Sequence, residues 1–264
     1  MILPLGDVDK TRIVPVVTYA LITLNVLTFA VQSMRGEDFN AAYAIVPYEI
    51  THRVDLTEPV FLELQGTEDP RVPAFRRVFE VPQAPGPVPI WLTLLTSMFM
   101  HGSFLHLAGN MLFLWIFGDN VEEVLGRVRY VLVYLTCGLI GSLFQIAAAP
   151  NSVIPCLGAS GAIAGVMGMY VIWFPHNRIV VLVFRFITEL PALVVIGLWI
   201  ALQVWAGVGS FGRVGESGGV AYLAHVGGAV AGIAAAFLFL NRARYDRMRR
   251  EAERGWTDRR PGAR

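Results

Sequence analysis

Two short stretches of this chain decide its fold, Gly158-Ala159-Ser160-Gly161 and Ala224-His225-Val226-Gly227-Gly228. Each lies inside a run of residues apolar enough to be buried in a lipid bilayer. A hydroxyl or an imidazole is costly to bury in lipid, so its presence there points to a functional role. Serine and histidine are also the smallest pair of side chains that performs nucleophilic catalysis at neutral pH. The two stretches therefore predict an enzyme that works inside a membrane.

The composition of the whole chain supports a membrane location. Of its 264 residues, 55% are hydrophobic and 16% are charged, whereas a soluble domain carries about a quarter charged residues. The net charge of +1 gives no reason to expect a nucleic-acid partner. Cys137 and Cys156 lie in apolar segments and lack the spacing of a metal site or a disulfide framework. We therefore expect no metal and no organic cofactor, and the lipid bilayer as the surrounding partner.

Six apolar segments without Lys, Arg, Asp or Glu predict an all-α membrane protein, a six-transmembrane-helix bundle with a long external loop between the first two helices. The segments are residues 13–33, 104–117, 130–149, 156–174, 190–209 and 220–240. Pro191 is well placed for the first turn of the fifth helix. Arg185 and Glu189, just before it, have the spacing of a pair on a helix, and we expect residues 177–188 to lie at the membrane interface.

Charges outside these segments predict the orientation of the chain. The tail at 241–264 carries nine arginines and four acids, whereas the loop at 34–90 carries five arginines and nine acids. Basic residues gather on the cytoplasmic side. We therefore expect residues 1–12 to form a cytoplasmic N-terminal segment and residues 241–264 a basic cytoplasmic tail. Residues 13–240 form the membrane domain, with its external loop at about 34–90.

The expected location is a bacterial plasma membrane, with both termini in the cytoplasm. The first twelve residues, MILPLGDVDKTR, carry acids and a proline where a cleaved signal peptide has a basic region followed by an apolar one. We therefore expect no cleaved targeting sequence.

This orientation brings four polar residues to a similar depth near the external surface, namely Ser160, His225, His106 and Asn110. His225 is the candidate general base for Ser160. His106 and Asn110 are four residues apart and therefore share one face of a helix. Their N–H groups, with the backbone N–H of Ser160, would stabilise an oxyanion. Because no Asp or Glu lies within the spans, we expect a Ser-His dyad rather than a triad.

Glycines surround both candidate catalytic residues. Gly158 and Gly161 flank the serine and leave room for a substrate backbone or for a close helix contact. Gly228 and Gly232 are four residues apart, a pattern that lets helices approach closely in lipid. We expect it to press the sixth span against the fourth and to bring His225 to Ser160.

Three motifs together resemble the rhomboid intramembrane serine proteases in their order, spacing and predicted depth. They are His101-Gly-Ser-Phe-Leu-His106-Leu-Ala-Gly-Asn110, Gly158-Ala-Ser160-Gly161, and Ala224-His225-Val-Gly-Gly228-xxx-Gly232. The resemblance runs from the first span to the sixth. It also assigns residues 117–123 to the inner end of the second span.

The resemblance implies a protease that cleaves transmembrane or juxtamembrane segments of membrane proteins. It makes Ser160 the nucleophile and His225 the base, and it places His106 and Asn110 at the oxyanion. Two positions depart from the pattern of some bacterial members. Where those members have a Trp-Arg pair in the external loop, this chain has Trp91-Leu92. Where they have a tyrosine that packs on the base, this chain has Ala164.

Two other functions remain open at this point. A catalytically inactive rhomboid-like protein that binds membrane clients would lack the serine or the histidine, and both are present. A small transporter would carry ionisable residues along a route through the bilayer and often an internal repeat. Taken singly, Ser160 would be read as a helix-packing residue and Asn110 as one that hydrogen-bonds a neighbouring helix.

Overall fold

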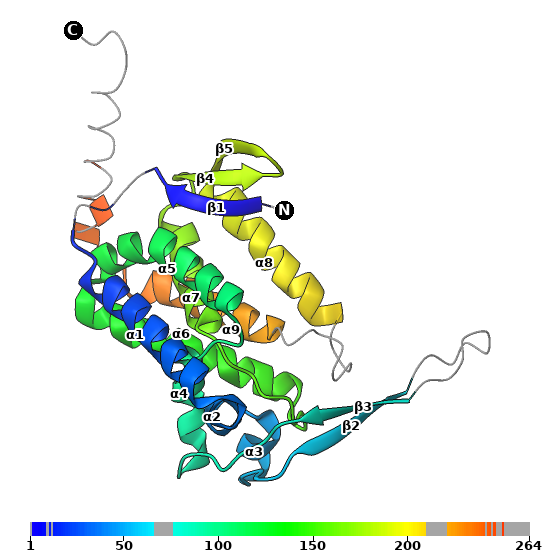
Figure 1. The fold of residues 1–264 in the computed structure, drawn as a ribbon. Helices are drawn as coiled ribbons and strands as arrows, with labels where there is room; N and C mark the ends of the chain where they lie inside the picture. The colour runs from blue at the N-terminus through cyan, green and yellow to red at the C-terminus, as the bar shows by residue number, and fades with distance from the viewer. Residues whose placement is uncertain are drawn as a thin grey trace, which may run out of the picture.

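The computed structural model describes residues 2–8, 11, 13–65, 76–209, 221–240, 242–243, 245–246 and 250. This part of the chain is mostly helical (Figure 1). An α-helix falls on each of the six predicted apolar segments: α1 (Val16–Arg35), α5 (Phe104–Leu125), α6 (Arg127–Ala148), α7 (Ser160–Trp173), α8 (Ala192–Gly209) and α9 (Tyr222–Leu238). Most of the predicted basic tail at 241–264 lies outside the described residues, as do residues 66–75 of the predicted loop.

Within the described residues, three helices are long and apolar enough to cross a membrane, namely α1, α6 and α8. A fourth span results if the short helices at 90–99 and α5 count as one span, bent by 75°. The apolar helices α7 and α9 are shorter, with 14 and 17 residues. Nearly every residue of α7 is buried, as expected for a helix that is apolar on all sides. The count of six membrane spans stays a prediction.

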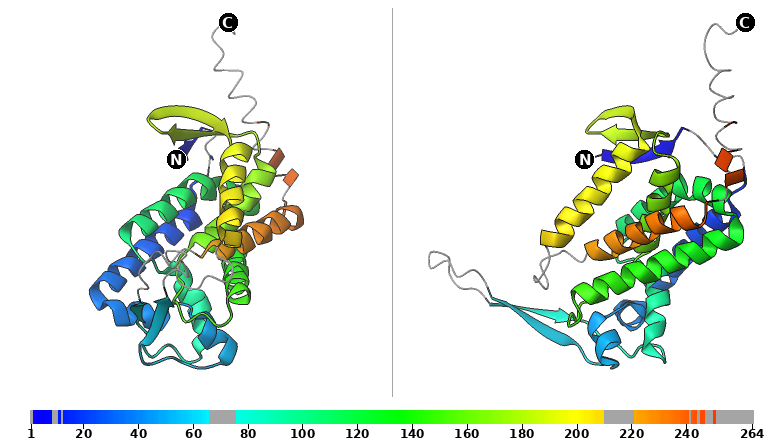
Figure 2. Two further views of the ribbon diagram at one scale, coloured as in Figure 1. Left: turned by 90° about the vertical axis from the view of Figure 1, so that its right-hand side faces the viewer. Right: turned by 180° about the vertical axis from the view of Figure 1, so that it is seen from behind.

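The expectation of an all-α fold is wrong in one respect, because the described residues include two small antiparallel sheets. Strands β1 (Ile2–Asp7), β4 (Arg178–Val183) and β5 (Phe186–Pro191) form a sheet in the order β1-β4-β5 at one end of the bundle (Figure 1). Strands β2 (Val60–Gln65) and β3 (Arg76–Val81) form a hairpin that projects from the opposite end (Figure 2). The fold is therefore mostly helical rather than all-α.

The segment before α8 is a β-hairpin, which changes two local predictions. Arg185 lies in the turn between β4 and β5, whereas Glu189 is in β5, so the helical spacing of these two residues loses its meaning. Glu189 instead forms a salt bridge of 3.3 Å with Arg178 on the neighbouring strand. Pro191 ends β5, and α8 begins at Ala192. The β-branched residues of β4 favour a strand, and its outer partner, β1, comes from the N-terminus of the chain.

Helix α5 continues beyond the apolar segment at 104–117 and includes the 117–123 stretch that the resemblance assigns to this span. Glu122 in its last turn is completely buried. The Glu122 carboxylate accepts hydrogen bonds from the backbone N–H groups of Val17 (3.0 Å) and Thr18 (2.8 Å) and from the Thr18 hydroxyl (2.9 Å). These backbone groups lie at the start of α1, where N–H groups lack helical partners and a negative charge is favourable. The fold thus accommodates a buried charge that lies beyond the apolar pattern.

The bundle has two distinct ends. Strand β1 and the described residues just after α9 lie at the same end (Figure 1), where the Tyr245 hydroxyl donates to the carbonyl of Trp173 at 2.8 Å. The opposite end carries the elements of the 34–90 loop and the turns that follow it: α2 (Glu37–Tyr43), α3 (Pro47–His52), η1 (Ile90–Leu92), α4 (Thr93–Thr96) and η2 (Ser97–Phe99). Ile45, between α2 and α3, forms a β-bridge with Cys156, just before α7. This bridge ties the loop to the N-terminal end of α7.

Helices α7 and α9 pack so closely that backbone meets backbone. A Cβ atom added at Gly228 would lie 1.9 Å from the carbonyl oxygen of Gly161, and one added at Gly232 would lie 1.9 Å from that of Gly165. No side chain fits at such distances, and glycines at four-residue spacing allow this approach in lipid. The contact sets the position of the first turn of α9 against the first turn of α7.

We expect Gly232→Ala to destabilise the protein, because the added methyl group collides with the α7 backbone. Overpacking of this kind costs about 1–3 kcal/mol and would lower the melting temperature measured in detergent. Gly197→Ala is the matched control, since a Cβ there meets nothing within 4 Å and alanine favours a helix. Equal melting of the two variants would contradict the proposed close contact.

We also expect Glu122→Ala to destabilise the protein by about 1.5–3 kcal/mol, because the start of α1 loses a charged hydrogen-bond acceptor. The control is Glu58→Ala, which changes an exposed carboxylate in the loop. Thermal unfolding in detergent measures both. An unchanged unfolding temperature of the Glu122→Ala protein would show that water or another group satisfies these N–H donors equally well.

Candidate active site

Ser160 is the first residue of α7, and the preceding Ala159 occupies the N-cap position without a side-chain capping hydrogen bond. The backbone N–H of Ser160 therefore belongs to the helix terminus, whose N–H groups have no helical acceptor. Gly158 has a φ of +138°, a conformation that side chains rarely adopt. A Cβ added at Gly158 would lie 3.1 Å from Nε2 of His106 and 3.5 Å from Oγ of Ser160. The glycine thus leaves open the space between the serine hydroxyl and the His106 ring.

His225 lies in the first turn of α9 and is 8% exposed. Its Nε2 is 2.7 Å from Oγ of Ser160, which is hydrogen-bonding distance. The two residues that the sequence singles out are therefore in direct contact across the α7–α9 interface, 65 positions apart in the chain.

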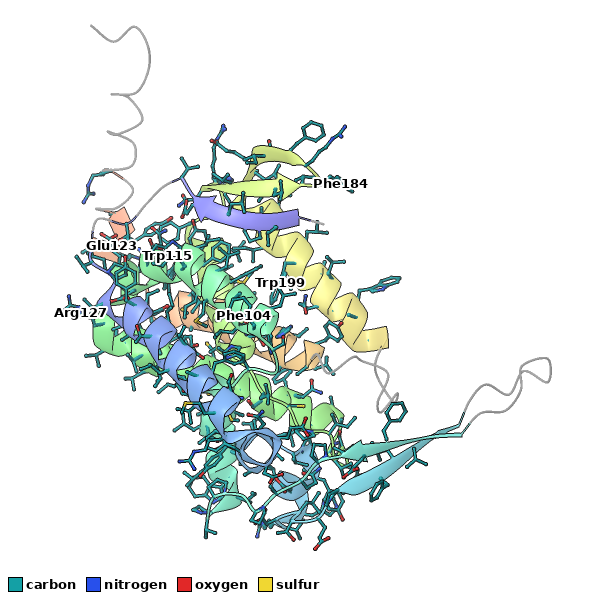
Figure 3. All side chains as sticks on the ribbon, viewed as in Figure 1. Phe104, Trp115, Glu123, Arg127, Phe184 and Trp199 are labelled. Carbon is teal, nitrogen blue, oxygen red and sulfur yellow. The ribbon has the colours of Figure 1, made fainter. Side chains whose placement is uncertain are left out.

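The other ring nitrogen of His225 has a partner that sequence reasoning missed. Nδ1 lies 2.7 Å from Oε1 of Gln203 on α8. Trp199, one turn earlier on α8, holds its ring 5.5 Å from the His225 ring between centroids, and Figure 3 shows Trp199 between α8 and the bundle. An aromatic neighbour for the base therefore comes from α8, whereas the position of the family tyrosine is occupied by Ala164.

One signal in the sequence could have revealed Gln203. It is the only side-chain amide in the apolar segment that forms α8, and a polar group within such a segment is by default a functional candidate.

The side-chain amide of Asn110, on α5, lacks an obvious hydrogen-bond partner in the described part of the chain. It is 8% exposed, and its Nδ2 has no hydrogen-bond acceptor among the described residues. A buried donor left unpaired costs about 1–3 kcal/mol. His106 lies one turn earlier on the same helix face, half-buried beside Gly158. This face of α5 therefore carries a donor without a partner among the described residues, one turn from the ring that lies beside Gly158.

The ring of His101 packs against that of His106 on this face of α5. His101 is 2% exposed, and its ring meets that of His106 edge-on with centroids 5.2 Å apart. Neither ring nitrogen has a hydrogen-bond partner within the described parts of the chain. Its backbone N–H donates to Oε1 of Gln32 at 2.9 Å, which anchors the turn before α5 to the end of α1. His101 thus packs against His106, and within the described residues no hydrogen bond joins its ring to Ser160.

A small cavity adjoins Ser160. It is lined by Gly158 and Gly161 around the serine, by Ser142 and Gln145 of α6, and by loop residues that include Ile45 and Pro47. Its interior volume of about 30 Å³ holds roughly two water molecules. Oε1 of Gln145 is buried without a partner among the described residues. The cavity therefore offers a polar group to water or substrate at the loop end of the bundle.

The groups around Ser160 are of the kinds that acyl transfer uses: a hydroxyl, an imidazole in contact with it, an amide oxygen at the other ring nitrogen, and on α5 a buried amide N–H without a partner among the described residues. The residues that the structure describes contain no cluster of three or more His, Cys, Asp or Glu side chains able to hold a metal ion.

Comparison with known proteins agrees with the resemblance seen in the motifs. The Rhomboid domain matches residues 89–242, more than half of the chain. Rhomboid protein 1, mitochondrial, of Saccharomyces cerevisiae is 34% identical over 146 residues, which are 54% of this chain and 40% of that protein. Rhomboid protease GluP of Bacillus subtilis is 35% identical over 147 residues, 55% of this chain and 25% of that protein.

The human presenilin-associated rhomboid-like protein, mitochondrial, is 34% identical over 91 residues, 34% of this chain and 24% of that protein. The chain thus spans less than half the length of these curated relatives. The domain match and the membrane-type helices lead to one conclusion: the chain belongs to the rhomboid family and is an integral membrane protein.

Proposed function

We propose that this protein is an intramembrane serine endopeptidase that cleaves transmembrane or juxtamembrane segments of other membrane proteins through a Ser160–His225 dyad. The observation that carries the proposal is the 2.7 Å contact between Nε2 of His225 and Oγ of Ser160. A serine hydroxyl is a weak nucleophile until an adjacent base removes its proton. One relative, Rhomboid protease GluP, is named as a protease and adds support by similarity.

In the first half of the reaction, Oγ of Ser160 attacks the carbonyl carbon of the substrate peptide bond while Nε2 of His225 takes the hydroxyl proton. The negative charge that forms on the carbonyl oxygen is stabilised by N–H donors. Nδ2 of Asn110, a ring N–H of His106 and the backbone N–H of Ser160 are the proposed donors. The C–N bond then breaks, and His225 gives its proton to the leaving amine.

In the second half, a water molecule attacks the ester formed on Ser160. His225 takes one proton from that water and returns it to Oγ, so that the serine is regenerated and the new carboxyl end is released. The cavity beside Ser160 has room for this water. The glycines that surround the serine leave space for the substrate backbone.

A catalytically inactive protein that binds membrane clients is the alternative. Client binding gives no reason for a base to contact a serine hydroxyl, or for a buried amide donor to lack a partner. These two observations favour the protease.

The proposed topology places both described ends of the chain in the cytoplasm and the 34–90 loop outside. The arginine-rich tail supports this orientation. The location of β1 and of residues 242–243 and 245–246 at one end of the bundle is consistent with an even number of crossings (Figure 1). The relatives come from a bacterium and from mitochondria, and a bacterial plasma membrane is the proposed location.

We expect Ser160→Ala and His225→Ala to abolish cleavage of a model single-span substrate reconstituted with the protein in liposomes. Both should also lose labelling by a fluorophosphonate probe, because the probe needs the same activated hydroxyl. Ser33→Ala, which changes an exposed hydroxyl on α1, is the control and should cleave as the wild type does. Undiminished cleavage by Ser160→Ala would remove this serine from the mechanism.

We expect Asn110→Ala to lower kcat by roughly 10²- to 10³-fold, the usual effect of losing one oxyanion donor, while the melting temperature changes little. Asn25→Ala is the matched control, because Asn25 is a buried amide on α1 that bonds the carbonyl of Leu21. It should affect stability more than turnover. If Asn110→Ala unfolds the protein and the remaining folded fraction cleaves at the wild-type rate, then Asn110 is structural.

A further inference from the structure

Gln203 contacts the candidate base from the side opposite to Ser160. Its Oε1 is 2.7 Å from Nδ1 of His225, and Nε2 of the same ring is 2.7 Å from Oγ of Ser160. The imidazole is thus held at both nitrogens by groups from two different helices. Carboxylates, which orient the histidine in a Ser-His-acid triad, are missing from the apolar segment that forms α8.

The chemistry of the two contacts decides where the imidazole proton lies. A neutral imidazole carries one N–H donor and one acceptor nitrogen, whereas the oxygen of an amide only accepts. Oε1 of Gln203 therefore requires the proton on Nδ1. The lone pair is then on Nε2, where it can accept the hydroxyl proton of Ser160. The opposite tautomer would set two lone pairs against each other at Nδ1 unless the amide were flipped, and it would leave no base beside the serine.

The same contact also strengthens when the ring gains a proton. After His225 takes the proton of Ser160, its Nδ1–H belongs to a cation, and a hydrogen bond from a cation is roughly twice as strong as a neutral one. Gln203 would therefore stabilise the protonated His225 ring more than the neutral ring. An interaction that strengthens toward the transition state in this way accelerates the step.

The position of Gln203 on α8 is suited to this role. Trp199 and Gln203 are four residues apart and share one helix face, so that one flanks the His225 ring while the other bonds its edge. The adjacent Leu202 is 55% exposed and lies on another face. At Gly207, one turn further along, an added Cβ would lie 3.0 Å from the side chain of Leu223, just before His225 in α9. Close contact between α8 and α9 thus holds the amide against the ring.

We propose that Gln203 is a positioning residue for His225: its side-chain carbonyl fixes the Nδ1–H tautomer and the ring orientation that let Nε2 act as the base. The catalytic part of this proposal rests on the proposed protease function. The tautomer part does not, because it concerns a proton on a ring nitrogen whatever the protein does.

The test compares three variants in detergent. Gln203→Met removes the acceptor while keeping a side chain of similar length, Gln203→Glu retains an acceptor oxygen, and Leu202→Met is the control on the same helix. The tautomer is read from ¹⁵N NMR spectra of histidine-labelled protein, with the His225 signals assigned by their loss in His225→Ala. We expect the Nδ1–H form in the wild type and in Leu202→Met, and a mixture or the Nε2–H form in Gln203→Met.

Cleavage of the model substrate supplies the second measurement. We expect Gln203→Met to lower kcat about 10- to 100-fold with KM nearly unchanged, Gln203→Glu to recover most of this loss, and Leu202→Met to match the wild type. A purely structural role would instead lower the melting temperature and leave the kcat of the folded protein intact.

Two results would overturn the proposal: an unchanged His225 tautomer in Gln203→Met, or a changed tautomer with a kcat equal to that of Leu202→Met. If Ser160→Ala cleaves as well as the wild type, the proposed Ser160–His225 dyad fails, and the NMR spectra still decide whether Gln203 sets the tautomer.

Discussion

The backbone contact between α7 and α9 is the constraint on which the site depends. The carbonyl oxygens of Gly161 and Gly165 occupy the space that side chains would need at Gly228 and Gly232. Lipid provides no hydrophobic force that brings helices together, so close van der Waals contact has to hold them. Gly161 follows Ser160 directly, and Gly228 lies three residues after His225. The same contact that packs the helices therefore sets the distance between the hydroxyl and the imidazole.

The remaining helices place groups around this pair. Helix α5 carries His106 and Asn110 on one face and Glu122 near its other end. The Glu122 carboxylate holds the start of α1, while Gln32 near the end of α1 holds the turn before α5. Both ends of this helix pair are thus joined by hydrogen bonds between residues far apart in the chain. Such bonds restrict how far the His106–Asn110 face can move relative to Ser160.

The sequence allowed much of the helical fold to be predicted, because helices that lie in lipid must be long and apolar. The resemblance extended the second span to residue 123, but the sequence did not reveal the partner of Glu122, whose charge is compensated by N–H groups of α1, 104 positions away in the case of Thr18. Nor did it reveal the hairpin before α8, whose strand β4 pairs with residues near the start of the chain. Each difference arises from a partner distant in sequence, which a local pattern of polarity does not contain.

The sequence by itself determined the chemistry of the candidate site: a serine, a histidine and an asparagine in apolar segments, the glycines that allow close packing, and the motifs of the rhomboid family. Only the tertiary structure decided which groups meet. It brought Gln203 and Trp199 of α8 to the His225 ring, placed His101 behind His106, and left Nδ2 of Asn110 without an acceptor among the described residues. Residue types and their spacing follow from the chain alone, whereas hydrogen-bond partners on different helices follow from how those helices pack.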